Sequence, residues 1–156
     1  MKTLSFQALK PVDRNLIQAA RAAARNAYCP YSGFAVGAAL RTADGRIVIG
    51  ANVENAAYGS TLCAERSALA SAYSQGCRVF RTLAVVAGKG GVPAAPCGAC
   101  RQMLFEASES AGKDIRILLA APRARRAHVT SIRELLPRGF GPLNLVGKRR
   151  GSAIRR

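Results

Sequence analysis

Three cysteines and one glutamate stand at spacings that suit a catalytic zinc site. Cys97 and Cys100 are separated by two residues, so both thiols can face one point in space if a helix begins there. Cys63 can supply a third sulfur from the start of another helix. Three protein ligands leave the fourth tetrahedral position open, as catalytic zinc sites require. Glu65, two residues after Cys63, lies within reach of that position, where a general acid and base belongs.

The chemistry of zinc explains why these residue types are needed. Thiolates rather than thiols bind the metal, and the unpaired amides at a helix N-terminus favour the charged sulfur. Zinc activates water as a nucleophile, and Glu65 would carry its proton to the substrate. Arg66 is expected to hydrogen-bond the ligand sulfurs and to offset their charge. The alternatives are a surface arginine at Arg66 and, at Glu65, a carboxylate that only complements the helix dipole.

Length and composition fit one globular domain. The chain has 156 residues, of which 49% are hydrophobic and 21% charged, and no apolar run approaches the length of a membrane span. Residues 1–10 do not resemble a secretory signal. Five cysteines, three of them assigned to a metal, argue against a disulfide framework and for a reducing, cytoplasmic setting. Cys29 and Cys77 are interpreted as small buried hydrophobic residues.

The formal net charge of +16 is concentrated toward the C-terminus. Residues 123–156 hold ten of the 24 lysines and arginines but only one of the eight acidic residues. One interpretation is a surface for nucleic acid or another acidic partner. The other is a solvated basic tail, and we favour it because no aromatic residues are interleaved with the tail's charges.

Helical and strand patterns alternate along the chain. Asp44-Gly45 between two apolar runs predicts a hairpin, and Gly37 within the first run indicates close approach by another backbone or a ligand. The pattern predicts an α/β domain over residues 1–146, with helices on a five-stranded mixed sheet, and a basic, disordered tail over residues 147–156. Expected helices cover residues 11–28, 63–75, 97–110 and 132–136, and expected strands cover residues 34–41, 46–51, 82–87, 115–120 and 127–131.

With these motifs, the chain resembles a known family, the small homotetrameric cytidine deaminases of pyrimidine salvage. The metal motif alone is that of zinc deaminases, which combine Cys-x-Glu or His-x-Glu with Pro-Cys-x-x-Cys. The resemblance covers about residues 10–145, and its departures are confined to Arg123–Arg126 and the tail after Val146. Its blocks are Cys29–Phe34, Val36–Leu40, Asn52–Tyr58, Cys63–Arg66, Pro96–Gln102, Glu134–Pro137 and Phe140–Pro142.

The resemblance implies a three-layer α/β/α, cytidine-deaminase-like fold, one zinc per chain and roles for further residues. Asn52 and Glu54 would hydrogen-bond the ribose 3′-hydroxyl, Phe34 would pack against the base, and the Ala64 backbone would contact the cytosine edge. The nucleoside-binding stretch would run through Asn52, Val53, Glu54, Asn55, Ala56, Ala57 and Tyr58. Positions similar to those contributed across subunit boundaries are Tyr31, Ala56, Tyr58 and Phe140. For Phe34 and Tyr31, ordinary core packing is the alternative.

The expected activity is zinc-dependent hydrolysis of cytidine and 2′-deoxycytidine to the uridines and ammonia. A homotetramer with active sites at subunit interfaces is expected, without a membrane or nucleic-acid partner. Three alternatives stay open: a deaminase of a related nucleoside, a deaminase of cytosine in polynucleotides, and a non-enzymatic zinc-stabilised binding module. His128, the one histidine, is expected at a sheet edge or on the surface.

Overall fold

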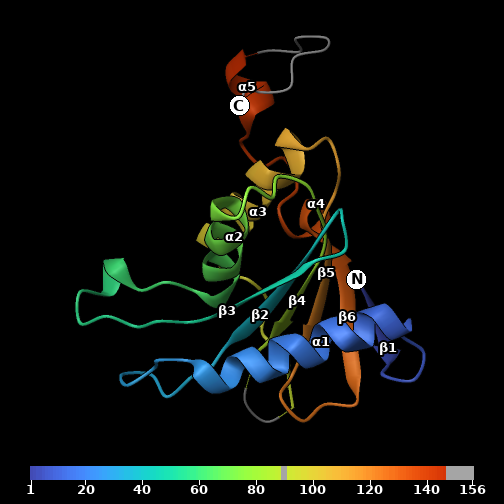
Figure 1. Ribbon diagram of the computed structural model, residues 1–156, viewed down its shortest axis with the longest axis vertical. Helices are drawn as coiled ribbons and strands as arrows, with labels where there is room; N and C mark the ends of the chain where they lie inside the picture. The colour runs from blue at the N-terminus through green and yellow to red at the C-terminus, as the bar shows by residue number, and fades with distance from the viewer. Residues whose placement is uncertain (89–90, 147–156) are drawn as a thin grey trace.

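A mixed six-stranded sheet with the strand order β1-β6-β5-β4-β2-β3 forms the centre of the molecule in our computed structural model (Figure 1). The structure describes residues 1–88 and 91–146. Neighbouring strands are antiparallel except for the parallel pair β4 and β5. The elements are β1 (Lys2–Ser5), α1 (Pro11–Ala23), η1 (Ala24–Asn26), β2 (Gly37–Thr42), β3 (Ile47–Ala51), η2 (Tyr58–Ser60), α2 (Ala64–Ser74), β4 (Phe80–Val86), α3 (Gly98–Ser110), β5 (Arg116–Ala120), β6 (Arg126–Ser131), α4 (Ile132–Leu135) and α5 (Pro142–Val146).

The sheet separates two hydrophobic clusters, which gives the expected three layers. Alternate residues of a strand point to opposite faces. In β4, Leu83 and Val85 join the cluster with α2 and α3, whereas Ala84 and Val86 join the cluster with α1. In Figure 1, α1 crosses one face of the sheet, and α2 and α3 lie on the other side. The alternation in the central strands therefore builds both cores from one short run of apolar residues.

Two glycines allow the helices to approach the sheet closely. A Cβ on Gly37 would overlap the backbone of α1 at Ala20 and of η1 at Ala24, so the close approach predicted at this residue is confirmed. A Cβ on Gly50 would overlap the backbone of α2 at Ala64 and Ala68. Gly50 therefore sets the depth at which the first turn of α2 is seated on β3.

The Asp44-Gly45 hairpin between β2 and β3 is confirmed, with Gly45 in the left-handed region at φ +92°. Such a conformation favours glycine because it has no Cβ. Another glycine in this region of φ, Gly76 at +80°, follows the C-terminal end of α2. The hairpin turn could thus be predicted from local sequence alone.

The prediction of five strands is wrong, because β1 adds a sixth. Its four residues pair with β6 in the register Lys2 to Val129, yet they are too few to display a clear alternation. The same omission makes the edge position predicted for His128 wrong. His128 is half-buried on β6, which lies between β1 and β5. The first helix is also shorter than expected, since α1 ends at Ala23 and a 3₁₀ turn follows.

A buried ion pair joins α1 to the sheet. Asp13 is 1% exposed, and its Oδ2 lies 2.6 Å from Nη1 of Arg116 on β5. Nη2 of Arg41 on β2 lies 3.8 Å from the other oxygen. A charge that is buried this deeply needs such partners, because leaving it unpaired would be strongly destabilising.

No described helix is both long and apolar enough to cross a membrane. The tail expected over residues 147–156 lies outside the described residues.

Candidate functional site

The three predicted metal ligands lie together at the starts of two helices. Cys63 is the N-cap residue of α2 and Cys97 is the N-cap residue of α3. Cys100 follows in the first turn of α3 and is fully buried. The helix N-termini turn their unpaired amides and the positive end of the dipole toward the sulfurs, which favours thiolates. Two loops at the same end of the sheet therefore converge on one sulfur cluster.

The spacing of the sulfurs fits a tetrahedral metal ion. The Cys63 and Cys97 sulfurs are 3.8 Å apart, the Cys97 and Cys100 sulfurs are 3.5 Å apart, and all three lie within 4.8 Å of one another. Zinc–sulfur bonds of about 2.3 Å in tetrahedral geometry require sulfurs about 3.8 Å apart. The three side chains can therefore hold one zinc ion with little rearrangement.

The pKa values of the three thiols differ because their local environments differ. Burial is the largest influence on each; it raises the pKa of Cys63 and of Cys100. At Cys97, burial has the same tendency, but hydrogen bonds from the Cys100 amide, the Cys100 and Cys63 thiols and the Ala99 amide together outweigh it and lower the pKa. Cys97 therefore deprotonates most readily, and binding of a cation would be coupled to proton release from the other two.

Glu65 lies on the first turn of α2, within the same pocket. It is 5% exposed, and this burial raises the pKa of its carboxyl group above the ordinary value. A buried carboxyl with a raised pKa can both accept and return a proton near neutral pH. The side chain is therefore suited to proton transfer at the fourth position of the sulfur cluster.

Arg66 reaches the sulfur cluster from the next position of α2. Its Nη2 donates a hydrogen bond to the Thr61 carbonyl at 2.6 Å and lies 3.9 Å from the Cys63 sulfur. The first contact fixes the guanidinium beside the ligand, and the second brings a positive charge to it. This placement fits the orienting role expected from the sequence and differs from that of a freely solvated arginine.

A pocket of about 390 Å³ opens over the sulfurs. The pocket is large enough for a small organic molecule. Its lining combines polar groups with apolar side chains from the end of β4 and from neighbouring loops. The lining residues are Ser32, Phe34, Val36, Asn52, Glu54, Thr61, Cys63, Ala64, Glu65, Val85, Ala87, Ala94, Ala95 and Cys97.

Asn52 hydrogen-bonds the backbone of a segment that lines this pocket. Its Oδ1 accepts a hydrogen bond from the Val36 amide at 2.8 Å, and its Nδ2 donates one to the Phe34 carbonyl at 3.0 Å. The residue is 7% exposed. Its amide therefore holds the extended segment that carries Phe34 in place, and one donor and one acceptor position remain on the side chain.

Glu54 binds the loop that precedes this segment. Its Oε2 accepts hydrogen bonds from the Tyr31 amide at 2.9 Å and the Ser32 amide at 3.1 Å, while the Ser32 hydroxyl donates to Oε1. The hydroxyl has the largest influence and, with the two amides, lowers the pKa of Glu54. Glu54 is therefore an ionised hydrogen-bond acceptor at the pocket rim.

The remaining predicted site residues divide into two groups. Phe34 and Ala64 line the pocket, and Tyr31 and Tyr58 line an adjoining hollow of about 360 Å³ that shares Ser32, Glu54 and Thr61 with it. Outside both linings, within the described chain, are Val53, Asn55, Ala56, Ala57 and Phe140.

Sequence reasoning identified Phe34 and Ala64 but missed the other apolar residues of the lining. Val85 and Ala87 lie at and just after the end of β4, and Ala94 and Ala95 lie just before the second cysteine pair. Nothing in their chemistry marks them. The one available signal was position, because loops after parallel strands commonly form ligand sites.

Comparison with known proteins gives a consistent result. The family model described as the cytidine and deoxycytidylate deaminase zinc-binding region matches residues 10–112. A cytidine deaminase of Halalkalibacterium halodurans is 48% identical over 80% of this chain and 91% of its own length. One of Mycobacterium tuberculosis is 45% identical over 89% of this chain and 98% of its own. A crystal structure of a cytidine deaminase from Burkholderia pseudomallei superposes with a TM-score of 0.74 at 48% identity, covering 81% of this chain and 97% of that one.

Proposed function

The chain belongs to the cytidine and deoxycytidylate deaminase family, and from that premise we propose that it converts cytidine and 2′-deoxycytidine to the corresponding uridines and ammonia. It is a zinc-dependent hydrolytic deaminase. The observation that carries the proposed reaction is the buried Glu65 carboxyl beside the three sulfurs of Cys63, Cys97 and Cys100, in a pocket that polar groups also line.

When bound, zinc supplies the positive charge that makes a water molecule a nucleophile near neutral pH. Glu65 then moves the protons. It takes one from the attacking water, delivers it to N3 of the base and returns a further proton to the 4-amino group, which leaves as ammonia. The raised pKa of Glu65 suits both directions of transfer. Water adds and ammonia departs, so no other reactant is needed.

The pocket wall offers groups that suit a nucleoside. The free donor and acceptor positions of Asn52 and the ionised Glu54 carboxylate can hydrogen-bond a ribose hydroxyl. A carboxylate that accepts from the 3′-hydroxyl tolerates ribose and deoxyribose alike. Phe34 offers a face to the base, and the amide of Ala64, at the first turn of α2, is one of those without an intrahelical partner. These roles form part of the proposal.

We further propose a homotetramer whose pockets are completed by neighbouring subunits. In Figure 1 the loop carrying η2 projects away from the layered body. Tyr31 is 53% exposed, Tyr58 76% and Phe140 60%, although the two tyrosine rings already contact each other edge to face at 6.1 Å. Exposed aromatic side chains beside a pocket commonly mark an interface. A pyrimidine-salvage role in the cytoplasm fits this activity and a site that depends on reduced cysteines.

The decisive experiment follows the loss of cytosine absorbance in the presence of the purified protein. Cytidine and deoxycytidine are supplied separately, before and after chelation of the metal and after restoration of zinc. The proposal requires turnover of both nucleosides that disappears with chelation and returns with zinc. No turnover with one zinc bound per chain would exclude it and would favour the polynucleotide or binding-module alternatives.

A further inference from the structure

A second cavity, of about 570 Å³, lies on the opposite side of the molecule's sheet from the sulfur cluster. It is formed where three segments meet: the turn after β1, the outer face of α1, and the connection between β5 and β6. Phe6 and α1 belong to the core on one face of the sheet, whereas α2, which carries Glu65, belongs to the core on the other. The lining residues are Ser5, Phe6, Gln7, Gln18, Arg21, Pro122, Arg123, Ala124, Arg125 and Arg126.

Four arginines line this cavity, and no acidic side chain does. All eight acidic side chains of the sequence fall among the described residues, and none of them lines the cavity. No salt bridge in the described chain includes any of these four arginines. Like charges gathered around one cavity repel one another unless an anion binds between them. The cavity is therefore a strongly cationic site without an internal counter-ion.

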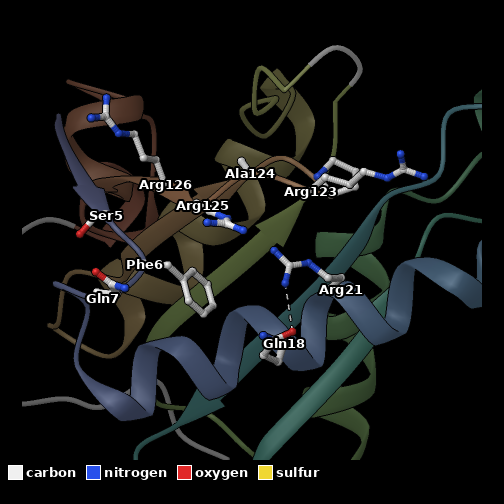
Figure 2. Close-up of a pocket in the computed structure, with 10 residues that line it drawn as sticks. Ser5, Phe6, Gln7, Gln18, Arg21, Arg123, Ala124, Arg125 and Arg126 are labelled. Atoms are coloured by element: carbon white, nitrogen blue, oxygen red, sulfur yellow. Dashed lines mark hydrogen bonds between the residues drawn. The ribbon is translucent and has the colours of Figure 1, made fainter.

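Arg21 and Arg125 occupy the middle of this site. Figure 2 shows both near the ring of Phe6, whereas the side chains of Arg123 and Arg126 extend away from that ring in opposite directions. The Arg21 guanidinium stacks at 5.8 Å from the centre of the Phe6 ring and donates to Oε1 of Gln18 at 3.1 Å. Its Nε is buried and has no hydrogen-bond partner in the described structure. The ring contact and the hydrogen bond to Gln18 thus hold the guanidinium in place, and its Nε–H remains available to donate a hydrogen bond to a ligand.

The chemistry of the lining identifies the class of ligand. Guanidinium groups bind phosphate oxygens through paired, charge-assisted hydrogen bonds. A single phosphate group carries about two negative charges at most, fewer than the four positive charges here. The volume lies within the range of about 300–1,000 Å³ that small-molecule sites occupy, and it exceeds the needs of one small ion. Side-chain amides of Gln7 and Gln18 add neutral donors.

We propose that this cavity binds a small ligand with two or three linked phosphate groups. Arg21 and Arg125 contact the phosphates, and Arg123 and Arg126 add positive charge around the cavity. The proposal concerns a site apart from the zinc pocket and holds whichever nucleoside that pocket accepts. It also accounts for the basic segment Arg123–Arg126, which the deaminase chemistry leaves without a role.

Calorimetric titration of the zinc-loaded protein with inorganic tripolyphosphate tests this proposal. We expect saturable binding of one ligand per chain, weakened about ten- to hundredfold by Arg21→Gln or by Arg125→Gln, because each substitution removes charge-assisted hydrogen bonds. Arg25→Gln is the matched control: it removes the same charge from an exposed residue just after α1, outside the cavity. Zinc content is measured after each titration, since tripolyphosphate also chelates metal ions. Retention of the melting temperature shows that the variants are folded.

Each outcome of the titration is decisive. No binding to the wild-type protein, or equal weakening by the Arg25 control, would overturn the proposal. Binding of a single-stranded oligonucleotide without binding of tripolyphosphate would replace the small ligand with a nucleic-acid backbone. Calorimetry requires no nucleoside turnover, so a failure of the deaminase assignment and a failure of this site are separately visible.

Discussion

The surroundings of two carboxyl groups in the pocket over the sulfur cluster shift their pKa values in opposite directions. Glu65 is buried, and desolvation raises its pKa. Glu54 lies at the exposed rim, where the hydroxyl and amide of Ser32 and the amide of Tyr31 stabilise its charged form and lower its pKa. Such divergence is how one site assigns different tasks to chemically similar groups. Glu65 is thereby suited to carrying protons and Glu54 to accepting hydrogen bonds.

The role of Glu65 leads to the first prediction. Glu65→Gln preserves size and hydrogen bonding but cannot exchange a proton, so turnover should fall by about two to four orders of magnitude. Zinc content and melting temperature should remain close to wild type, because the amide replaces none of the three sulfurs. Glu106→Gln, an exposed carboxylate on α3, is the control and should keep full turnover. Substantial activity of Glu65→Gln would assign the proton transfer to another group.

The low pKa of Glu54 gives the second prediction. Because its folded-state pKa is depressed, the contacts to Tyr31 and Ser32 contribute stability above the ordinary pKa and lose it as the pH falls through the lowered one. Ser32→Ala removes the donor with the largest influence. The pKa of Glu54 should rise toward its ordinary value, so loss of these contacts should begin at a higher pH. Carboxyl NMR titration measures this, and an unchanged pKa would contradict the assignment.

Ser60→Ala is the control for this titration. Ser60 lies in η2, in the same connection between β3 and α2 as Glu54, but its hydroxyl makes no hydrogen bond to Glu54. The pKa of Glu54 should therefore be the same in this variant as in the wild-type protein.

At the level of elements, the depth of α2 against β3 determines where Cys63 and Glu65 lie. Gly50 is the contact that sets this depth, since any Cβ there overlaps the α2 backbone. Gly50→Ala should destabilise the fold by about 1–3 kcal/mol through overpacking. Because helix displacement moves the cysteine but leaves α3 in place, zinc affinity should fall as well. Denaturant unfolding and a competitive zinc titration measure the two effects.

Gly59→Ala provides the matched comparison for Gly50. Gly59 has no atom within 4 Å of a hypothetical Cβ, so the same chemical change there meets open space. It should alter neither unfolding nor zinc affinity. Equal behaviour of the two variants would show that the packing of α2 tolerates the added methyl group.

The elements that could be predicted from sequence are those whose cause is local. Asp44-Gly45 specifies its hairpin, and the apolar runs specify β4 and β5. β1 was missed because its four residues become a strand only by pairing with β6, far along the chain. Likewise, the five-residue helix α5 has too short a pattern to recognise.

The site divides in the same way. Cysteine spacing indicated the sulfur cluster because the chemistry of zinc restricts ligand types. The apolar lining, by contrast, is assembled by the tertiary fold from residues such as Val85 and Ala94, whose types carry no functional signal. The burial of Asp13 between two sheet arginines was equally invisible, since an aspartate in a first helical turn is ordinary on local grounds.

At the level of the whole molecule, one chain brings together the sulfur cluster and its pocket but leaves aromatic side chains exposed. Phe140 is the most informative of these. Its carbonyl accepts a hydrogen bond from Nε2 of Gln102 on α3 at 2.7 Å, which fixes the backbone, while 60% of the residue remains exposed. Phe140 does not line the pocket of its own chain. In a closed symmetric assembly, each chain can offer such a residue to a neighbour.

Mixing two impaired variants tests this arrangement. Glu65→Gln lacks the proton carrier, and Phe140→Ala should lose activity if the ring completes a neighbour's pocket. When the two are dissociated together and reassembled in equal amounts, about a quarter of the pockets should combine an intact Glu65 with a partner's intact Phe140, if chains assort at random. Turnover should then exceed that of either variant alone. If Phe140 acts within its own chain, no pocket regains both residues, and the mixture will show only the average of the two.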